Sequence, residues 1–272
     1  MEDEFLIYLK EKVGEHLIAS FEHADLLLWG ARDGDGVVLL GLTLAIGVQD
    51  PANMKEISQL SKKVKDIMEI AFSLSKKSNS VFFTICYSIS GSSLFRITNP
   101  KDPLNLMSSL VVDEKSTPAM IERLFMTNFG STGTEKPVNK STSDWFHRWT
   151  RANLPTQYVK ANIDGLVLDQ EAKPVILLET KRSFESSNTW RPYQADSRNY
   201  YLQNMISKKA ALDFWAVYHV KGLPVDDSSD IALFIVTDVS LINQEWISYA
   251  RSNVKARKVI ELIQKRCGKM ER

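Results

Sequence analysis

The sequence lacks several features that mark whole classes of protein. Only two cysteines, Cys86 and Cys267, occur among 272 residues. Neither a disulfide framework nor a thiolate zinc site is therefore indicated, and a reducing cytoplasm is the expected location. The formal net charge is only +1, which gives no overall preference for nucleic acid or for a membrane surface. Any electrostatic function must come from a local group of charges.

Long apolar runs and several catalytic motifs are also missing. The longest apolar stretch, residues 36–48, is shorter than the roughly 20 residues of a membrane-spanning helix. The N-terminal segment is acidic with helical spacing and does not resemble a signal peptide, so we expect neither secretion nor a membrane partner. The chain has no nucleophile elbow and no dinucleotide loop. Covalent hydrolases and Rossmann oxidoreductases are thus disfavoured, which leaves metal-dependent chemistry.

The composition, 44% hydrophobic and 25% charged, suits one large globular domain or two small ones. The periodicity predicts an α/β fold with a mixed central sheet flanked by helices. We expect a boundary between residues 115 and 116, and no internal repeat is evident. Residues 1–115 carry no chemical motif, and three roles stay open for them: binding nucleic acid, binding a partner subunit, or simply extending the core. The predicted elements of the second part are helices at 143–151 and 192–212, strands at 158–168, 175–181, 214–220 and 230–236, and a C-terminal helix.

Three charged residues lie in the first two of these strands, which are otherwise apolar. Asp164 lies in one strand, and Glu179 and Lys181 lie at the end of the next. Because side chains alternate between the two faces of a strand, Glu179 and Lys181 share a face. The short turn between the strands predicts that they are antiparallel neighbours. All three charges are then expected to converge.

Two carboxylates within reach of one another suit Mg²⁺ or Mn²⁺, which prefer oxygen ligands. Asp164 and Glu179 are the candidate ligands, and the carbonyl of Thr180 adds a third oxygen. A lysine beside such an ion can orient or deprotonate the attacking water. The pattern therefore predicts phosphodiester hydrolysis, although a surface salt bridge alone would explain Glu179 and Lys181.

An Asp in one strand followed by a strand ending Glu-x-Lys resembles the PD-(D/E)xK nuclease superfamily. The resemblance covers residues 141–220, with Ile163-Asp164 in place of Pro-Asp and Glu179-Thr180-Lys181 intact. It implies a restriction-endonuclease-like core within residues 116–272 and a metal-dependent endonuclease that acts on DNA rather than RNA. A homodimer is left open.

The resemblance also implies further site residues. Gln194 fits the glutamine that supports the site from the helix after the second strand, and Asp144 or Glu122 fits an additional acid. Two groups of residues are candidates for contact with nucleic acid, because they combine cations with rings that can stack on bases. These residues are Arg198 and Tyr201 on the helix face of Gln194, and Arg182, Trp190 and Arg191 in the preceding loop.

Two other classes of function remain open. One is a catalytically silent nucleic-acid-binding or assembly module that keeps the nuclease-like fold. The other is a metal phosphoesterase acting on small nucleotides, for which the loop of aromatic and arginine residues would form a lid.

Overall fold

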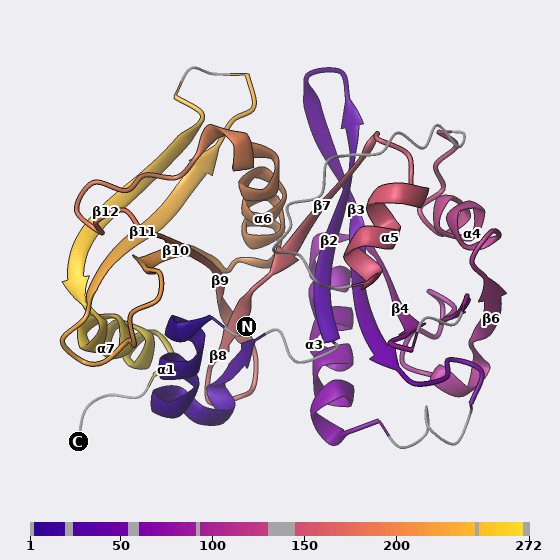
Figure 1. Ribbon diagram of the computed structural model, residues 1–272, viewed down its shortest axis with the longest axis horizontal. Coiled ribbons are helices and arrows are strands. Elements are labelled where there is room, and N and C mark those ends of the chain that lie inside the picture. The colour runs from indigo at the N-terminus through magenta and orange to yellow at the C-terminus, as the bar shows by residue number, and fades with distance from the viewer. Residues whose placement is uncertain are drawn as a thin grey trace. The chain divides into compact units, whose positions relative to one another are not determined.

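The computed structural model describes residues 3–19, 24–53, 60–90, 93–129, 145–242 and 245–268. The chain divides into two compact units (Figure 1). Unit 1 comprises residues 1–20 and 163–272, and unit 2 comprises residues 21–162. Each unit has one mixed β-sheet, and the described residues contain six α-helices. The mixed α/β class predicted from the sequence is therefore confirmed.

The sheet of unit 1 has six strands in the order β1-β8-β9-β10-β11-β12. β9 and β10 are parallel, and the other neighbouring strands are antiparallel. The strands are β1 (Leu17–Ala19), β8 (Gly165–Leu168), β9 (Pro174–Ser183), β10 (Asp213–Val220), β11 (Asp230–Val239) and β12 (Ile247–Lys255).

Helices cover both faces of this sheet. α6 (Ser197–Ala210) connects the parallel strands β9 and β10 and follows a 3₁₀ turn, η3 (Gln194–Asp196). α1 (Glu4–Val13), which leads through η1 (Gly14–His16) into β1, and α7 (Ala256–Arg266) cover the opposite face. There the core includes Phe5, Leu178, Val217, Leu233 and Val259.

The sheet of unit 2 also has six strands, in the order β6-β5-β4-β3-β2-β7. β3 and β4 are parallel, whereas the pairs β2–β3, β4–β5 and β5–β6 are antiparallel. The strands are β2 (Ala24–Asp33), β3 (Gly36–Val48), β4 (Val81–Ser88), β5 (Leu94–Ile97), β6 (Leu110–Asp113) and β7 (Tyr158–Ile163). A short 3₁₀ turn, η2 (Leu106–Ser108), precedes β6.

The helices of unit 2 are placed in the same way. α3 (Lys62–Ser78) connects β3 and β4. The opposite face carries α4 (Thr117–Leu124) and α5 (Trp145–Asn153), whose aromatic side chains fill the core. Phe125 packs 5.3 Å from Phe83 between ring centroids, and Trp149 packs 4.6 Å from Phe95. None of the helices in the described part of the chain has both the length and the apolarity needed to cross a lipid bilayer.

The two units differ from the division expected at residues 115 and 116. That position lies inside unit 2, because Ile121 of α4, the Phe125 that follows it, and the aromatic side chains of α5 and β7 complete the core of the unit 2 sheet. Conversely, α1 and β1 belong to unit 1, because β1 pairs with β8 and α1 packs on the core of the unit 1 sheet. Each unit thus receives a helix and an edge strand from the other half of the sequence.

The two halves of the chain also repeat one order of elements, although no repeat was expected from the sequence. Each half has a helix, an edge strand, an antiparallel hairpin, a connecting helix, a parallel strand, two antiparallel strands and a final helix. The connecting helices α3 and α6 both end in a left-handed residue, Asn79 and Ala211, two positions before the next strand. These caps and the strand registers allow the units to be compared residue by residue.

Candidate active site

The two strands that frame the predicted charges are neighbours in the sheet of unit 1. β8 and β9 pair antiparallel, with Gly165 opposite Leu178. Asp164 directly precedes β8, and Glu179 directly follows Leu178 along β9. The register therefore brings Asp164 and Glu179 to the same end of the hairpin, as the short turn predicted.

Glu179 and Lys181 project from the same face of β9, as strand alternation predicted. Lys181 Nζ lies 2.7 Å from Glu179 Oε1. It also lies 3.2 Å from the Oδ2 atom of Asp196, at the end of the turn that precedes α6. The lysine is therefore held between two carboxylates.

α6 adds two buried polar side chains to this group. Gln203 is 1% exposed, and its Nε2 donates a 2.5 Å hydrogen bond to Glu179 Oε2. The Tyr200 ring is fully buried, and its centroid lies 5.8 Å from Lys181 Nζ. The Tyr200 hydroxyl has no hydrogen-bond partner among the described residues. A buried, unpartnered hydroxyl beside these charges is a site where a water or ligand oxygen can be bound.

Asp164 is fixed by hydrogen bonds to Thr180. Asp164 Oδ2 accepts one from the Thr180 amide at 2.8 Å and one from the Thr180 hydroxyl at 3.2 Å. Within a strand the N–H and C=O of one residue point to the same edge, so the Thr180 carbonyl also faces the edge where Asp164 lies. Oxygen atoms of Asp164, Glu179 and Thr180 are therefore gathered at one corner of the sheet.

The charges at this corner do not balance. Three carboxylates, those of Asp164, Glu179 and Asp196, lie around one ammonium group. Burial raises the pKa of Asp164 well above its ordinary value, and the Glu179 carboxylate raises it further. Burial alone would lower the pKa of Lys181, but the combined interactions with Glu179, Tyr200 and Asp196 outweigh this and raise it. The electrostatics of the corner favour an additional positive charge beside Asp164.

Unit 2 holds apolar residues at the positions that match these charges. The parallel registers of Ile176 with Asp213 and of Gly41 with Val81 align β9 with β3. β8 is aligned with β2 through the pairing of each with its neighbour, and α6 is aligned with α3 through the left-handed residue that ends each helix. The matched residues are Leu26 for Asp164, Leu44 for Glu179, Ile46 for Lys181, Met68 for Tyr200 and Ala71 for Gln203. All five residues in unit 2 are buried. The fold can therefore be built without charges at these positions.

The predicted site glutamine, Gln194, and the glutamine that contacts Glu179 are different residues. Gln194 is the first residue of η3 and is exposed, and the glutamine in contact with Glu179 is Gln203. The sequence had placed Gln194, Arg198 and Tyr201 on one helix face, whereas the side that meets the site carries Asp196, Tyr200 and Gln203. Both sets follow the i, i+4, i+7 spacing, but the observed set lies two residues further along the chain. The burial of Tyr200 sets this orientation of the helix. The polar residues at that spacing were a usable signal.

The predicted nucleic-acid contacts lie in different environments. Arg198 is exposed and Tyr201 is partly exposed on α6. Arg191 is exposed, and its Nη1 donates to the carbonyl oxygen of Trp190 at 2.9 Å. Trp190 itself is 1% exposed and stacks on Tyr218 with ring centroids 4.4 Å apart. Its ring faces the core and is not available to stack on a base.

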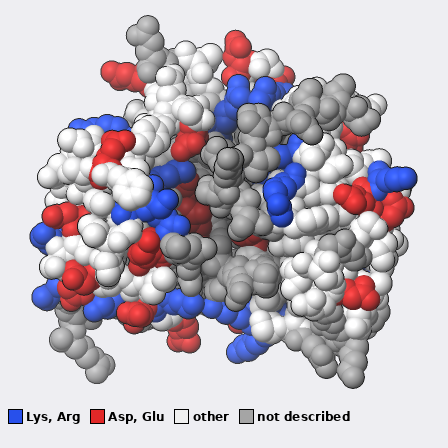
Figure 2. All heavy atoms as spheres, in the orientation of Figure 1, with Lys and Arg blue, Asp and Glu red and all other residues white. Residues whose placement is uncertain are grey.

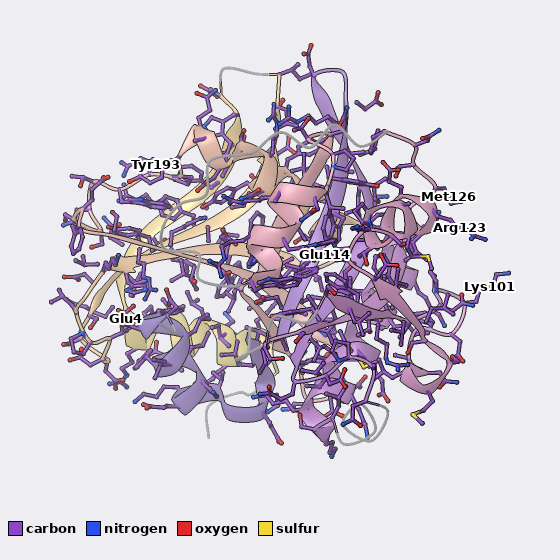
Figure 3. The ribbon with its side chains drawn as sticks, turned by 45° about the vertical axis from the view of Figure 1, so that its right-hand side comes forward. Glu4, Lys101, Glu114, Arg123, Met126 and Tyr193 are labelled. Atoms are coloured by element: carbon purple, nitrogen blue, oxygen red, sulfur yellow. The ribbon has the colours of Figure 1, made fainter. Side chains whose placement is uncertain are left out.

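Two other aromatic residues of this loop reach the surface, Phe184, which is 82% exposed, and Tyr193, which is 46% exposed. Tyr193 points outward from unit 1 in Figure 3, and its hydroxyl donates a 2.6 Å hydrogen bond to Glu185 Oε1. Phe184 and Tyr193 are therefore the rings of this loop that are placed to meet a ligand.

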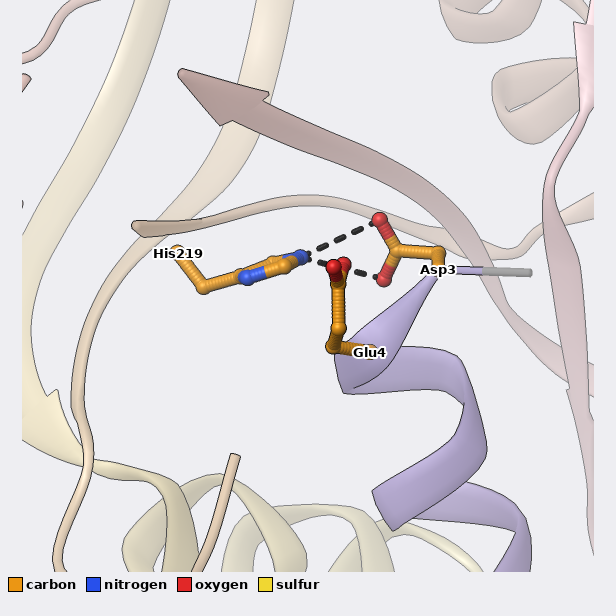
Figure 4. Close-up of side chains that lie close together, drawn as sticks. All are labelled: Asp3, Glu4 and His219. Atoms are coloured by element: carbon orange, nitrogen blue, oxygen red, sulfur yellow. Dashed lines mark hydrogen bonds and ion pairs between the residues drawn. The ribbon is translucent and has the colours of Figure 1, made fainter. Parts of the chain in front are cut away.

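Arg182 belongs to a separate polar cluster on the opposite face of β9. Figure 4 shows the other members of this cluster, Asp3, Glu4 and His219. His219 Nε2 lies 3.1 Å from Asp3 Oδ2, and Arg182 forms ion pairs with Asp3 and Glu4. Burial would raise the pKa of Asp3, but the combined interactions with His219, the Leu6 amide and Arg182 outweigh it and lower the pKa. Two carboxylates and a histidine can hold a metal ion in principle, but the Arg182 guanidinium already forms ion pairs with both acids. The geometry indicates an ion-pair network rather than a cation site.

The two candidates for an additional acid differ in what the structure describes. Asp144 lies outside the described residues. Glu122 lies in α4 of unit 2, where its Oε1 accepts a 3.2 Å hydrogen bond from the Phe129 amide. Asp196, which was not predicted, is the acid found beside Lys181.

No model of a protein family matches the chain, and no curated protein sequence matches it significantly.

Proposed function

We propose that the chain is a metal-dependent nuclease of the PD-(D/E)xK type, with a restriction-endonuclease-like core in unit 1, that hydrolyses phosphodiester bonds in DNA. The observation that carries the proposal is the convergence of Asp164, Glu179 and Lys181 at one corner of the sheet. The apolar residues at the matching corner of unit 2 support it, because they indicate that stability does not require these charges. Buried charges that a fold does not need are concentrated at functional sites.

The donor atoms at the corner fit a hard divalent cation. Asp164, Glu179 and the Thr180 carbonyl offer only oxygen, the ligand that Mg²⁺ and Mn²⁺ prefer. The surplus of carboxylates over cations supports the same assignment, since a bound cation would compensate for the unfavourable burial of Asp164. Such an ion would supply charge neutralisation at the phosphate and a more acidic water.

Lys181 acts in this proposal as a cation that positions water and phosphate. Its raised pKa keeps it protonated, so it donates hydrogen bonds and does not accept the proton of the attacking water. Gln203 and Asp196 act as positioning residues. Gln203 fixes one oxygen of Glu179, and Asp196 fixes the ammonium of Lys181.

The nucleic acid is contacted by local groups rather than by a broad positive surface. On the face drawn in Figure 2, acidic and basic side chains are interspersed, in agreement with the net charge of +1. Arg191, Tyr193, Arg198 and Tyr201 are the exposed or partly exposed candidates near the site. The proposal includes a cytoplasmic location, since a chain with two cysteines suits a reducing compartment.

One observation favours a second candidate, a catalytically silent binding module. Lys181 is paired with Glu179 and Asp196, so its charge is satisfied within the protein. A module of this kind would bind nucleic acid without consuming it.

The two candidates are separated by incubating plasmid, linear DNA and RNA with the protein and Mg²⁺ or Mn²⁺. We expect metal-dependent breakage of DNA that is lost in Glu179→Gln and in Lys181→Met. The matched controls are Glu171→Gln and Lys173→Met, because Lys173 and Glu171 form a similar pair two residues apart on the exposed turn of the same hairpin. Binding without breakage, or equal breakage by all variants, would contradict the nuclease proposal.

A further inference from the structure

The repeated order of elements has a consequence for how many bonds one chain can break. We infer that unit 2 is a second copy of the fold of unit 1 that has no hydrolytic centre. One chain therefore cuts a DNA duplex one strand at a time and releases nicked DNA as its first product. This inference rests on the proposed nuclease function and adds the form of its product.

Several independent features support the view that the two units are copies of one fold. The strand order, the parallel pairing of the two strands at the centre of the sheet and the position of the helix that connects them are the same in both sheets. Both connecting helices end in equivalent turns: the Ser80 amide donates to Ser75 O at 2.9 Å, and the Leu212 amide donates to Ser207 O at 2.8 Å. The residues at these two turns include Ser-Lys-Lys in both copies, at 75–77 and at 207–209. Local likeness in sequence and likeness in topology thus coincide.

The matched corner of unit 2 carries apolar side chains where unit 1 carries charges. In place of Asp164, Glu179 and Lys181, unit 2 has Leu26, Leu44 and Ile46. These side chains are 6%, 1% and 3% exposed. Apolar side chains offer no ligand to a cation and no donor to a phosphate, and their burial leaves the corner closed to solvent. Unit 2 therefore cannot provide a second centre of the same kind.

The stoichiometry of phosphodiester hydrolysis sets how many ester bonds one centre can break at a time. In each hydrolysis a water oxygen bonds to phosphorus, one phosphorus–oxygen ester bond breaks, and a proton from the water ends on the departing oxygen. A double-strand break requires two such events at two phosphates on opposite strands. A chain with one centre must carry out these events in sequence, with the nicked duplex between them. A homodimer, by contrast, would bring two centres to one duplex.

A plasmid assay tests the inference with the full-length chain. Supercoiled plasmid and Mg²⁺ are incubated with protein over a range of concentrations, and nicked and linear forms are followed over time. We expect nicked circles to form most of the product before linear DNA appears, and the ratio of nicked to linear DNA, compared at equal consumption of supercoiled plasmid, to stay constant when the protein is diluted. Glu179→Gln should form neither product, and Glu171→Gln should behave as wild type.

Two results would overturn the inference while leaving the nuclease proposal intact. One is linear DNA that forms without a nicked intermediate. The other is a ratio of nicked to linear DNA that falls as protein concentration rises even at equal consumption of supercoiled plasmid, which would indicate two chains acting together. The absence of any breakage that depends on Mg²⁺ and Glu179 would overturn the nuclease proposal and this inference with it.

Discussion

The charged corner of unit 1 can be rebuilt with the apolar residues that unit 2 uses, and we expect the chain to tolerate this. The test compares Glu179→Leu with the triple variant Glu179→Leu/Lys181→Ile/Gln203→Leu. The first two changes reproduce Leu44 and Ile46, and the third replaces the Gln203 amide with an apolar side chain of similar size. The single variant leaves polar partners behind, whereas the triple variant removes them together.

The magnitudes follow from the contacts. Removing one partner of a buried ion pair costs about 3–5 kcal/mol. We expect the lower end for Glu179→Leu, because Lys181 is 23% exposed and keeps Asp196. The Gln203 amide also loses its acceptor, which adds about 1–3 kcal/mol. The single variant should therefore be less stable than wild type by roughly 4 kcal/mol in total.

The triple variant should behave in the opposite way. Replacing a buried pair by apolar residues of similar volume is neutral or stabilising by about 1–4 kcal/mol. Asp196 loses its lysine partner, but it is 33% exposed and therefore loses less than about 1 kcal/mol. We expect the triple variant to match or exceed wild type in stability and to have no nuclease activity.

Urea unfolding, followed by circular dichroism, measures these differences. Because the chain has two units, the transition of unit 1 should be identified from fluorescence of Trp190, Trp215 and Trp246 before midpoints are compared. A triple variant that is less stable than Glu179→Leu would refute the reasoning. Such a result would mean that the charges hold the fold together and would remove the main support for a functional role.

Three further predictions concern stability. Asp164→Asn should be more stable than wild type at neutral pH. Because the pKa of Asp164 is raised in the folded state, its contribution to stability is lost as pH rises through the folded-state pKa. Thermal unfolding across a range of pH should show that the difference between the variant and wild type disappears at acid pH. Asp3→Asn should cost about 2 kcal/mol at neutral pH through the lost charge beside His219, and the cost should shrink as pH falls through the lowered pKa of Asp3; a cost independent of pH would contradict this. Gly41→Ala should destabilise unit 2 by about 1–3 kcal/mol or more, because its Cβ would lie 2.3 Å from a backbone oxygen, whereas Gly36→Ala, with a 3.3 Å contact, should cost less in the same urea assay.

The parts of the site that were predicted correctly depend on local geometry. Strand alternation places Glu179 and Lys181 on one face, and a short turn makes β8 and β9 antiparallel neighbours. Both rules operate within about twenty residues of sequence, and distant contacts do not override them. The distance of 2.7 Å between the two side chains confirms the shared face.

The parts that were not predicted depend on contacts between distant residues. β1 pairs with β8, and α1 packs on the core of unit 1, so the two units exchange a helix and an edge strand. No local pattern reports such an exchange. The phase of α6 is a similar case, because it is set by the burial of Tyr200 against the sheet, where its ring packs 5.8 Å from Phe214. The observed site face of α6 is shifted by two residues from the predicted one, which is why Gln203 rather than Gln194 contacts Glu179.

The comparison of the two units also bears on what a buried charge indicates. A single salt bridge at a strand end is a weak sign of function, because such pairs are common. Here the same chain contains the fold with an apolar corner, as Leu26, Leu44 and Ile46 are buried in ordinary packing. Unit 1 retains Asp164 although burial makes its ionised form unfavourable. A sequence that keeps a costly charge where an apolar residue is compatible with the fold is expected to use that charge in chemistry or binding.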